Sequence, residues 1–225
     1  KIQCINSGFN LNETLKYAIA IDDKIENTIS YAFDEQLGYL TSNISDVGTG
    51  LKASVMIHLP ALTMNKEIKT IIKDFKNAGI DINGVYVEND NIVGNLYVIS
   101  NTITLGLTEE EIINRLKEAV INIIKEEKKY REVLISKCRY EIEDKIFRAL
   151  GVLKSAILLD HKEMLECLSM VRLGTELSLL DIDKRKLNKL LVSSSDISIQ
   201  NKFDIPLSKQ EIKHQRARHV QEILS

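Results

Sequence analysis

Several residues that could do chemistry lie between Phe33 and Leu62. Gly48 and Gly50 flank one threonine, as in a loop that lets a phosphate approach the backbone, and Lys52 could add a positive charge. Taken alone, a Gly-x-Gly pair is typical of a turn, and a single lysine is typical of a solvated surface. His58 favours a structural role, because no Ser or Cys partner for nucleophilic catalysis is evident nearby.

The order of residues in this stretch is more specific than any single residue, because it resembles the ATP:guanido phosphotransferases, the family of the creatine and arginine kinases. The shared segments are residues 33–35, 38–42, 48–51, 53–56 and 58–62. Three positions depart from the family pattern: Asn43 stands for its reactive Cys, Ile44 for its Pro, and Lys52 for its Arg.

The resemblance implies phosphoryl transfer from ATP with Mg²⁺, a reaction that needs phosphate charge neutralised and a guanidinium oriented by carboxylates. It implies catalytic positions at Asn43 and Glu88. The nucleotide-binding positions that it implies are Lys1, Lys52, Ala53, Ser54, Val55, Met56, Asn83, Gly84, Val85, Tyr86, Val87 and Glu88. No position is expected to hold a metal through protein ligands alone.

Three arginine positions of the family are occupied by Lys1, Lys52 and Asn83. Lysine keeps the charge but loses the planar fork of arginine, and asparagine loses the charge as well. The amide of Asn43 cannot ionise as a thiol does. At these positions the chain therefore lacks both the arginines that stabilise charge and the thiol that can ionise.

Two functions stay open on these residues. The first is a protein-arginine kinase that transfers the ATP γ-phosphate to arginine side chains of proteins, with this chain impaired or inactive alone. The second is a catalytically degenerate regulatory or phosphoarginine-binding protein. The family's acidic Asn-Glu-Glu-Asp-His motif and its Arg-rich segment do not occur before Ile2. We therefore expect the chain to be the C-terminal part of a longer protein, whose upstream sequence would separate the two functions.

The C-terminus resembles a second family motif, Arg-Asp-x-x-Arg-Ala, which forms a phosphoarginine pocket. The corresponding positions are Lys213, Arg216 and Ala217, of which only the last two match. Lys209, Lys213 and Arg216 would share one helix face that could hold an anion. A solvated basic helix end is the simpler interpretation of the same spacing.

The elements that must position these residues alternate between helices and strands. Apolar spacing predicts helices over residues 10–30 and 68–77, and a capping box of Thr108 and Glu111 predicts the start of another. Strands are expected over residues 2–6, 38–42, 53–59, 80–87 and 94–100. These elements predict an α+β fold with an antiparallel sheet and flanking helices.

From residue 131 the pattern becomes wholly helical, with helix starts at Asp160 and Ser208. We therefore expect the C-terminal part of a guanidino-kinase-like catalytic domain over 1–131. An all-helical C-terminal domain over 132–225, a candidate phosphoarginine-docking domain, would follow. Residues 143–145 and 171–174 narrow the resemblance to the protein-arginine kinases. The mixed charges of residues 126–129 indicate a solvated helix face.

Composition places the chain among ordinary soluble proteins, with 44% hydrophobic residues, 28% charged residues and a net charge of −2. Nucleic-acid and membrane binding are disfavoured, and a cytoplasmic location is expected. The odd number of cysteines (Cys4, Cys138 and Cys167) favours free, small, buried thiols. The partners that the resemblance implies are arginine-containing protein substrates, a stress-response repressor, a zinc-binding activator protein and a Clp-type unfoldase. A homodimer is one expected assembly.

Overall fold

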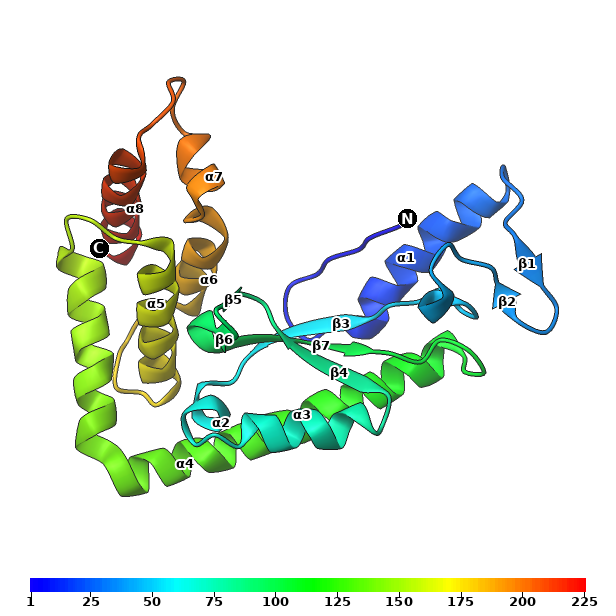
Figure 1. The fold of residues 1–225 in the computed structure, drawn as a ribbon, viewed down its shortest axis with the longest axis horizontal. Helices are drawn as coiled ribbons and strands as arrows, with labels where there is room; N and C mark the ends of the chain where they lie inside the picture. Colours follow the sequence, from blue (N-terminus) through cyan, green and yellow to red (C-terminus); the bar gives the residue numbers. More distant parts are fainter. The chain divides into compact units, whose positions relative to one another are not determined.

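The computed structural model describes residues 1–225 and consists of two compact units (Figure 1). Unit 1 contains residues 1–57, 67–83 and 97–126. Unit 2 contains residues 58–66, 84–96 and 127–225. The chain therefore enters each unit more than once. The predicted division into two domains at residue 131 falls inside a helix and stays a prediction.

Unit 1 begins with an irregular segment, so the strand expected over residues 2–6 is wrong. Ile5 is 86% exposed there, and no neighbouring strand satisfies the backbone. Helix α1 (Leu11–Glu26) confirms the next prediction but ends four residues early. Strands β1 (Phe33–Asp34) and β2 (Gly38–Tyr39) form a two-residue antiparallel hairpin, shorter than the strand expected over 38–42.

A three-stranded sheet follows, with the order β3 (Ser54–His58), β7 (Leu96–Asn101), β4 (Ile80–Gly84). Helix α3 (Ile68–Lys76) precedes β4 and ends before Gly79, whose φ of +76° favours glycine. Ile80, Ile82, Tyr97 and Ile99 are buried. The mixture of helices with small antiparallel sheets confirms the α+β class.

Helix α4 (Glu109–Ser155) starts at the predicted capping box, where the backbone N–H of Thr108 donates to Glu111 at 2.8 Å. The backbone N–H of Glu111 donates in return to the Thr108 hydroxyl at 3.2 Å. The helix is broken at Cys138, where φ is −136° and ψ is 42°. Its first part, up to residue 126, belongs to unit 1 and buries the apolar stripe Ile112, Ile113, Leu116, Val120 and Ile123.

In unit 2, a short helix α2 (Pro60–Met64) and a hairpin of β5 (Val87–Glu88) and β6 (Asn91–Ile92) precede the main helices. Asn89 and Asp90 make the hairpin turn, both with positive φ, as a two-residue turn of type I′ requires. A 3₁₀ turn, η2 (Val93–Asn95), leads out of the hairpin and packs against α5 (His161–Glu176).

Helices α5, α6 (Lys184–Ser193) and α8 (Lys209–Leu224) enclose the core of unit 2, and α7 (Asp196–Gln200) connects the last two. Ser208 and Glu211 form a complete capping box at the start of α8, as predicted. The fully buried core residues include Leu153, Met164, Val171, Leu187, Leu190 and Val220.

Two expectations about polar residues are wrong. Glu127 is only 3% exposed, although the charge run around it suggested a solvated face. Its carboxylate accepts the backbone N–H groups of Ala61 at 3.1 Å and Leu62 at 3.0 Å. These N–H groups lie in the first turn of α2, where a helix has no carbonyl acceptor of its own for them. The cysteines are free, as expected, but none is buried: Cys138 is exposed, and Cys4 and Cys167 are half-buried.

Candidate functional site

The loop that follows β2 is fixed by Thr104. Its hydroxyl donates to the carbonyl oxygens of Val47 at 2.7 Å and Ser45 at 3.1 Å, and its own carbonyl accepts the N–H of Thr49 at 3.1 Å. Gly48 has a φ of +112°, and a Cβ there would lie 2.4 Å from the Thr104 carbonyl oxygen. The Gly-x-Gly pair is therefore needed for close backbone contact.

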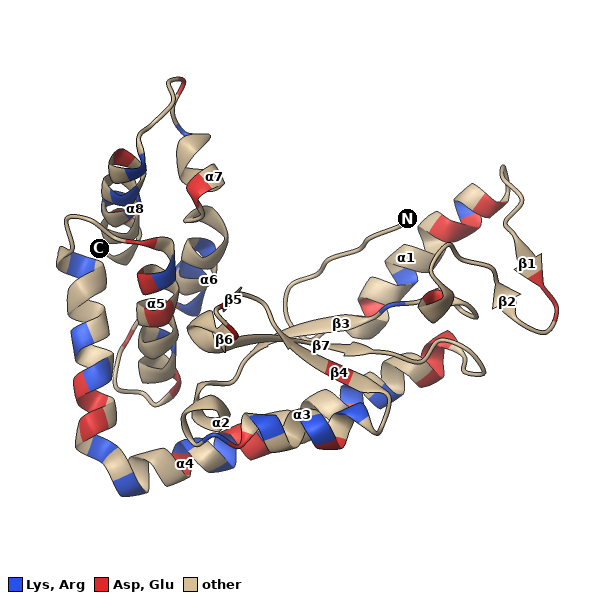
Figure 2. Cartoon of the chain, viewed as in Figure 1, with Lys and Arg blue, Asp and Glu red and all other residues tan.

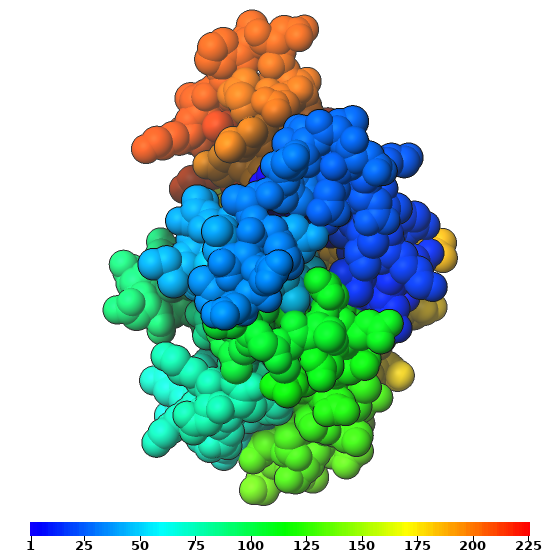
Figure 3. All heavy atoms as spheres, turned by 90° about the vertical axis from the view of Figure 1, so that its right-hand side faces the viewer, coloured from blue at the N-terminus to red at the C-terminus, as the bar shows by residue number.

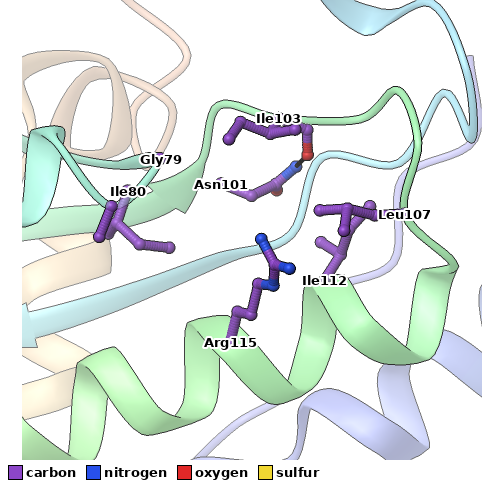
Figure 4. Close-up of a pocket in the computed structure, with 8 residues that line it drawn as sticks. Gly79, Ile80, Asn101, Ile103, Leu107, Ile112 and Arg115 are labelled. Carbon is purple, nitrogen blue, oxygen red and sulfur yellow. Dashed lines mark hydrogen bonds between the residues drawn. The ribbon is translucent and has the colours of Figure 1, made fainter.

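Lys52 follows this loop, and its backbone neighbours are held by one buried amide, that of Asn101. The Asn101 Oδ1 accepts the N–H of Ala53 at 2.8 Å, and the Nδ2 donates to the carbonyls of Leu51 at 3.0 Å and Ile103 at 3.2 Å. Figure 4 shows Asn101 beside Ile103. The Lys52 side chain is exposed and forms no ion pair. Its ammonium is therefore available to bind an anion, and the backbone on either side of it is held in place by hydrogen bonds.

Asn101 was not predicted as a functional residue. The only available signal was an asparagine ending an apolar strand, and that signal cannot name a partner 50 residues earlier in the sequence. Along β3, Ala53 is buried, Val55 is half-buried, and Ser54 and Met56 are exposed. Burial therefore alternates from Ala53 to Met56, but His58, which continues the face of Ser54 and Met56, is buried.

Asn43 and Lys1 lie on the surface of unit 1. The Asn43 Nδ2 donates to the Asp46 carboxylate at 3.3 Å, and its carbonyl accepts the Thr41 hydroxyl at 2.7 Å. The amide is thus used in local turn structure and offers no ionisable group. Lys1 is exposed in the irregular segment before α1.

Asn83 ends the part of β4 that belongs to unit 1, and its Nδ2 donates to the Asp81 carboxylate at 2.7 Å. Gly84 begins the following segment of unit 2, where a Cβ would lie 2.6 Å from Cγ1 of Ile92. A larger residue at that position would push the hairpin apart. Val85 and Tyr86 continue the backbone pairing with Leu96 and Val93, at 2.9 Å and 2.8 Å.

Two contacts join the hairpin to α5 within unit 2. The Tyr86 ring meets the His161 ring edge-to-face with centroids 5.8 Å apart. The Glu88 carboxylate lies 2.9 Å from Nζ of Lys162. Both members of this ion pair are about half exposed, so the pair adds little stability, while the Glu88 carboxylate remains open to solvent. Val87 is 60% exposed beside it.

His58 has a serine partner that sequence reasoning missed. Its Nε2 lies 2.7 Å from the Ser169 hydroxyl, which also accepts the Asn95 Nδ2 at 2.8 Å. Burial lowers the pKa of His58 to about 3, and the nearby charges of Arg172 and Arg131 act in the same direction. His58 is 8% exposed and Ser169 4%, so no substrate can reach the pair. The neutral imidazole is a buried polar contact.

At the C-terminus, the expectation of a solvated basic face is wrong for Arg216, which is 1% exposed. Its Nε donates to the Ser194 carbonyl at 2.7 Å, its Nη1 to the Leu159 carbonyl at 2.9 Å, and its Nη2 to the Asp196 carboxylate. Ala217 is buried as well. Lys213 pairs with Asp160 at 2.8 Å, so the three predicted pocket residues serve internal contacts.

Unit 1 contains two hollows of different size. The pocket in Figure 4 has a volume of about 10 Å³, enough for roughly one water. Arg115 and Asn101 are among the residues that line it. A second hollow, beside the β1–β2 hairpin, has a volume of about 290 Å³. No helix has the length and apolar character needed to cross a bilayer.

Comparison with known proteins agrees with the sequence motifs. Residues 1–130 match the family model "ATP:guanido phosphotransferase, C-terminal catalytic domain", and residues 139–225 match "Protein-arginine kinase McsB C-terminal domain". A crystal structure of lombricine kinase is 26% identical over 54% of this chain and 34% of its own, with a TM-score of 0.46.

Three relatives are named protein-arginine kinase. The one from Clostridium botulinum is 55% identical over all of this chain and 66% of its own length. Those from Clostridium tetani and Bacillus cereus are 49% and 42% identical, over 98% and 100% of this chain and 65% and 64% of their own lengths. The chain thus spans about two thirds of the length of these relatives. It belongs to the ATP:guanido phosphotransferase family, in the branch of the protein-arginine kinases.

Proposed function

We propose that this chain supplies the C-terminal catalytic part of a protein-arginine kinase, which transfers the γ-phosphate of ATP to arginine side chains of proteins. The observation that carries the proposal is the pair of consecutive family matches, the catalytic one over 1–130 and the protein-arginine kinase one over 139–225. The second match favours protein arginine as the acceptor over a small guanidino compound.

Lys52 is the residue of unit 1 that best suits a phosphate. Its ammonium is exposed and without an ion pair, and Asn101 holds the backbone on both sides. A point charge on a fixed backbone can neutralise a phosphate, although it lacks the two-pronged geometry of arginine. Lys1 and the exposed positions Ser54 and Met56 complete the candidate nucleotide surface on this unit.

ATP and Mg²⁺ are both part of the proposal. The chain contains no group of three or more His, Cys, Asp or Glu side chains that could hold a metal ion, so Mg²⁺ would arrive with the nucleotide phosphates. Bound MgATP supplies the transferable phosphoryl group. Glu88, whose carboxylate is half exposed beside Lys162, suits the orientation of a guanidinium.

A second function, that of a degenerate regulatory protein, is favoured by specific observations. The Asn43 and Asn83 amides carry no charge and are occupied by Asp46 and Asp81. Under this alternative the unit-2 helices would carry the activity, as a phosphoarginine-docking domain. The contacts of Arg216 argue against phosphoarginine docking at this residue, because its N–H groups already donate to carbonyl groups of the chain.

The finer parts of the proposal concern the whole protein. We infer a guanidino-kinase catalytic domain followed by a helical domain over 132–225, with a cytoplasmic location. The proposed partners are arginine-containing protein substrates, a stress-response repressor, a zinc-binding activator and a Clp-type unfoldase. A homodimer is the proposed assembly.

The test compares this chain with a chimera that joins it to the third of the Clostridium botulinum relative that it does not match. Each is incubated with MgATP and an arginine-rich protein, and phosphoarginine is measured by mass spectrometry. We expect transfer by the chimera and none by the chain alone. Within the chimera, Lys52→Met should lower kcat by about 100-fold, the effect of losing one preorganised charged contact.

The matched control is Lys69→Met, which removes an exposed lysine on α3 and should leave the rate unchanged. Transfer by the 225-residue chain alone would refute its predicted inactivity. If the chimera is inactive while the intact relative transfers phosphate, the degenerate regulatory function replaces the kinase.

A further inference from the structure

The groove of about 290 Å³ in unit 1 lies between the β1–β2 hairpin and the segment that leads into α4. Figure 3 shows the hairpin region in blue directly above the start of α4 in green. Its wall is formed by Phe33, Leu37, Tyr39, Thr104, Leu105 and Leu107, with Glu109 at its end. Gly48 and Thr49 of the glycine loop also line it, whereas Asn43, Lys52, Asn83 and Glu88 do not.

The floor of the groove is apolar and its aromatic rings are fixed. The Tyr39 ring contacts Phe33 with centroids 5.3 Å apart and Tyr31 with centroids 5.8 Å apart, both edge-to-face. Phe33 is nevertheless 59% exposed, and Leu37 and Leu105 are 46% and 49% exposed. A preorganised apolar surface therefore faces solvent, which costs free energy unless something covers it.

Carboxylates surround these rings. The Tyr39 hydroxyl contacts the Glu26 carboxylate at 3.4 Å, and the Tyr31 hydroxyl donates to Asp22 at 2.9 Å. Burial raises the pKa of Tyr39, and the negative charges of Glu26, Asp22 and Glu109 act in the same direction. Figure 2 shows red segments near the end of α1, in the β1–β2 turn and at the start of α4, with blue also near the end of α1, where Lys24 lies.

The N-terminus of α4 would by itself attract anions, through a partial positive charge of about half a unit. Three successive carboxylates in its first turn, on Glu109, Glu110 and Glu111, more than offset that charge. The groove therefore combines apolar and aromatic side chains with the carboxylate of Glu109 at its end. This combination repels nucleotides and acidic peptides, and it complements a cation with an apolar stem.

We propose that this groove docks an arginine-bearing segment of a protein partner beside the Gly48–Gly50 loop. The guanidinium is planar, more weakly hydrated than an ammonium, and stacks on aromatic rings, so it fits beside Phe33 and Tyr39 better than lysine does. Its methylene stem would lie on Leu37 and Leu105. The identification of the partner as a kinase substrate rests on the proposed function, whereas the binding itself does not.

The experiment measures binding of short fluorescent peptides to the 225-residue chain by anisotropy, without nucleotide. The peptides contain two arginines, two lysines or two citrullines in the same Gly/Ser sequence. We expect the arginine peptide to bind best, the lysine peptide less well and the citrulline peptide not at all. Glu109→Gln and Phe33→Ala should each weaken arginine-peptide binding by about five- to tenfold, as loss of a charge or a ring contact requires.

The matched control is Glu118→Gln, which removes an exposed carboxylate farther along α4 and should leave affinity unchanged. Circular dichroism checks that each variant is folded. Equal binding of the arginine and lysine peptides, an equal loss in the Glu118→Gln control, or no binding at all would overturn the proposal.

The docking proposal and the proposed kinase function can fail independently. If the chimera transfers phosphate but Glu109→Gln and Phe33→Ala bind the peptide like the unaltered chain, the docking proposal falls and the kinase stands. If the variants lose peptide binding while no phosphate is transferred by the chimera, docking stands and the kinase falls.

Discussion

Helices α1 and α5 each contain 16 residues, yet they differ in what they bury. In α1 only Leu11 is buried, and Tyr17, Ile19 and Ile21 are 57%, 43% and 44% exposed. In α5 the buried residues are Met164, Leu165, Leu168, Ser169, Val171, Leu173 and Gly174. Both sequences have apolar residues at helical spacing, so the spacing indicates a helix but not whether its apolar face has a partner.

The difference extends to polar contacts. On α5, Ser169 bonds His58 and Asn95, and Lys162 pairs with Glu88 of the hairpin. Most polar contacts of α1 are at the surface, such as the long contact of Tyr17 with Glu13 at 3.4 Å, and its part-buried one joins Asp22 to the Tyr31 hydroxyl at 2.9 Å. We infer that α5 organises unit 2, whereas α1 depends mainly on its own helix propensity within this chain.

The largest expected effect is a loss of stability on truncating a buried side chain of α5, compared with an exposed one of α1. Met164→Ala should lower the free energy of unfolding of unit 2 by about 2–5 kcal/mol, because it leaves a cavity in a fully buried site. Ile19→Ala on α1 should change stability by no more than about 0.5 kcal/mol, because its side chain is exposed and alanine is a better helix former.

Urea unfolding followed by circular dichroism, with hydrogen exchange of each helix, measures both changes. Similar losses in the two variants would mean that α1 is packed as well as α5, and the comparison would fail.

A smaller effect is expected at Arg216, which holds the segment before α5 through the Leu159 carbonyl. Arg216→Met should destabilise unit 2 by about 2–3 kcal/mol, because the Leu159 and Ser194 carbonyls lose a charged donor in a buried place. Thermal and urea unfolding test this, with exposed Arg218→Met on the same helix as the control. If Arg216→Met leaves stability unchanged, the internal contacts of the Arg216 guanidinium contribute little, and in the unaltered chain it would be available to an anion.

The smallest effect is a pH dependence of stability caused by His58, whose imidazole contacts Ser169 of α5. Because its folded pKa is lowered to about 3 from the ordinary 6.5, the unfolded state takes up the proton first as the pH falls. Stability is therefore lost from pH 6.5 down to about 3, at up to roughly 1.4 kcal/mol per pH unit. His58→Gln should remove this slope, so its stability relative to the unaltered chain should rise by about 1 kcal/mol between pH 7 and 5.5.

Exposed His214→Gln is the control and should keep the slope of the unaltered chain. If His58→Gln keeps that slope too, the His58 imidazole is not held neutral by burial, and its contact with α5 is looser than the 2.7 Å distance indicates.

Features set by neighbouring residues could be predicted from the sequence. The capping boxes of Thr108 with Glu111 and Ser208 with Glu211 involve residues three apart, and both are confirmed. The strand expected over residues 2–6 is wrong because a strand also needs a neighbour, which local residues do not specify. The family motifs allowed the protein-arginine kinase branch to be identified.

Features set by distant residues could not be predicted. Glu127 is separated by 65 residues from Leu62, whose N–H it accepts, so its charge run looked like a solvated face. Ser169 lies 111 residues from His58. Arg216 matched a motif, but its burial depends on carbonyls from two other loops. Function at the remaining candidate positions stays a prediction for the same reason.

The break of α4 at Cys138 has a practical consequence for spectroscopy. Its thiol is exposed, whereas burial raises the pKa of the Cys167 thiol to about 11 and keeps it in the unreactive protonated form at neutral pH. With half-buried Cys4 changed to serine, a maleimide dye or spin label should attach at Cys138 alone. The chain thus carries a natural attachment point at the irregular turn of its longest helix, where bending of that helix can be recorded.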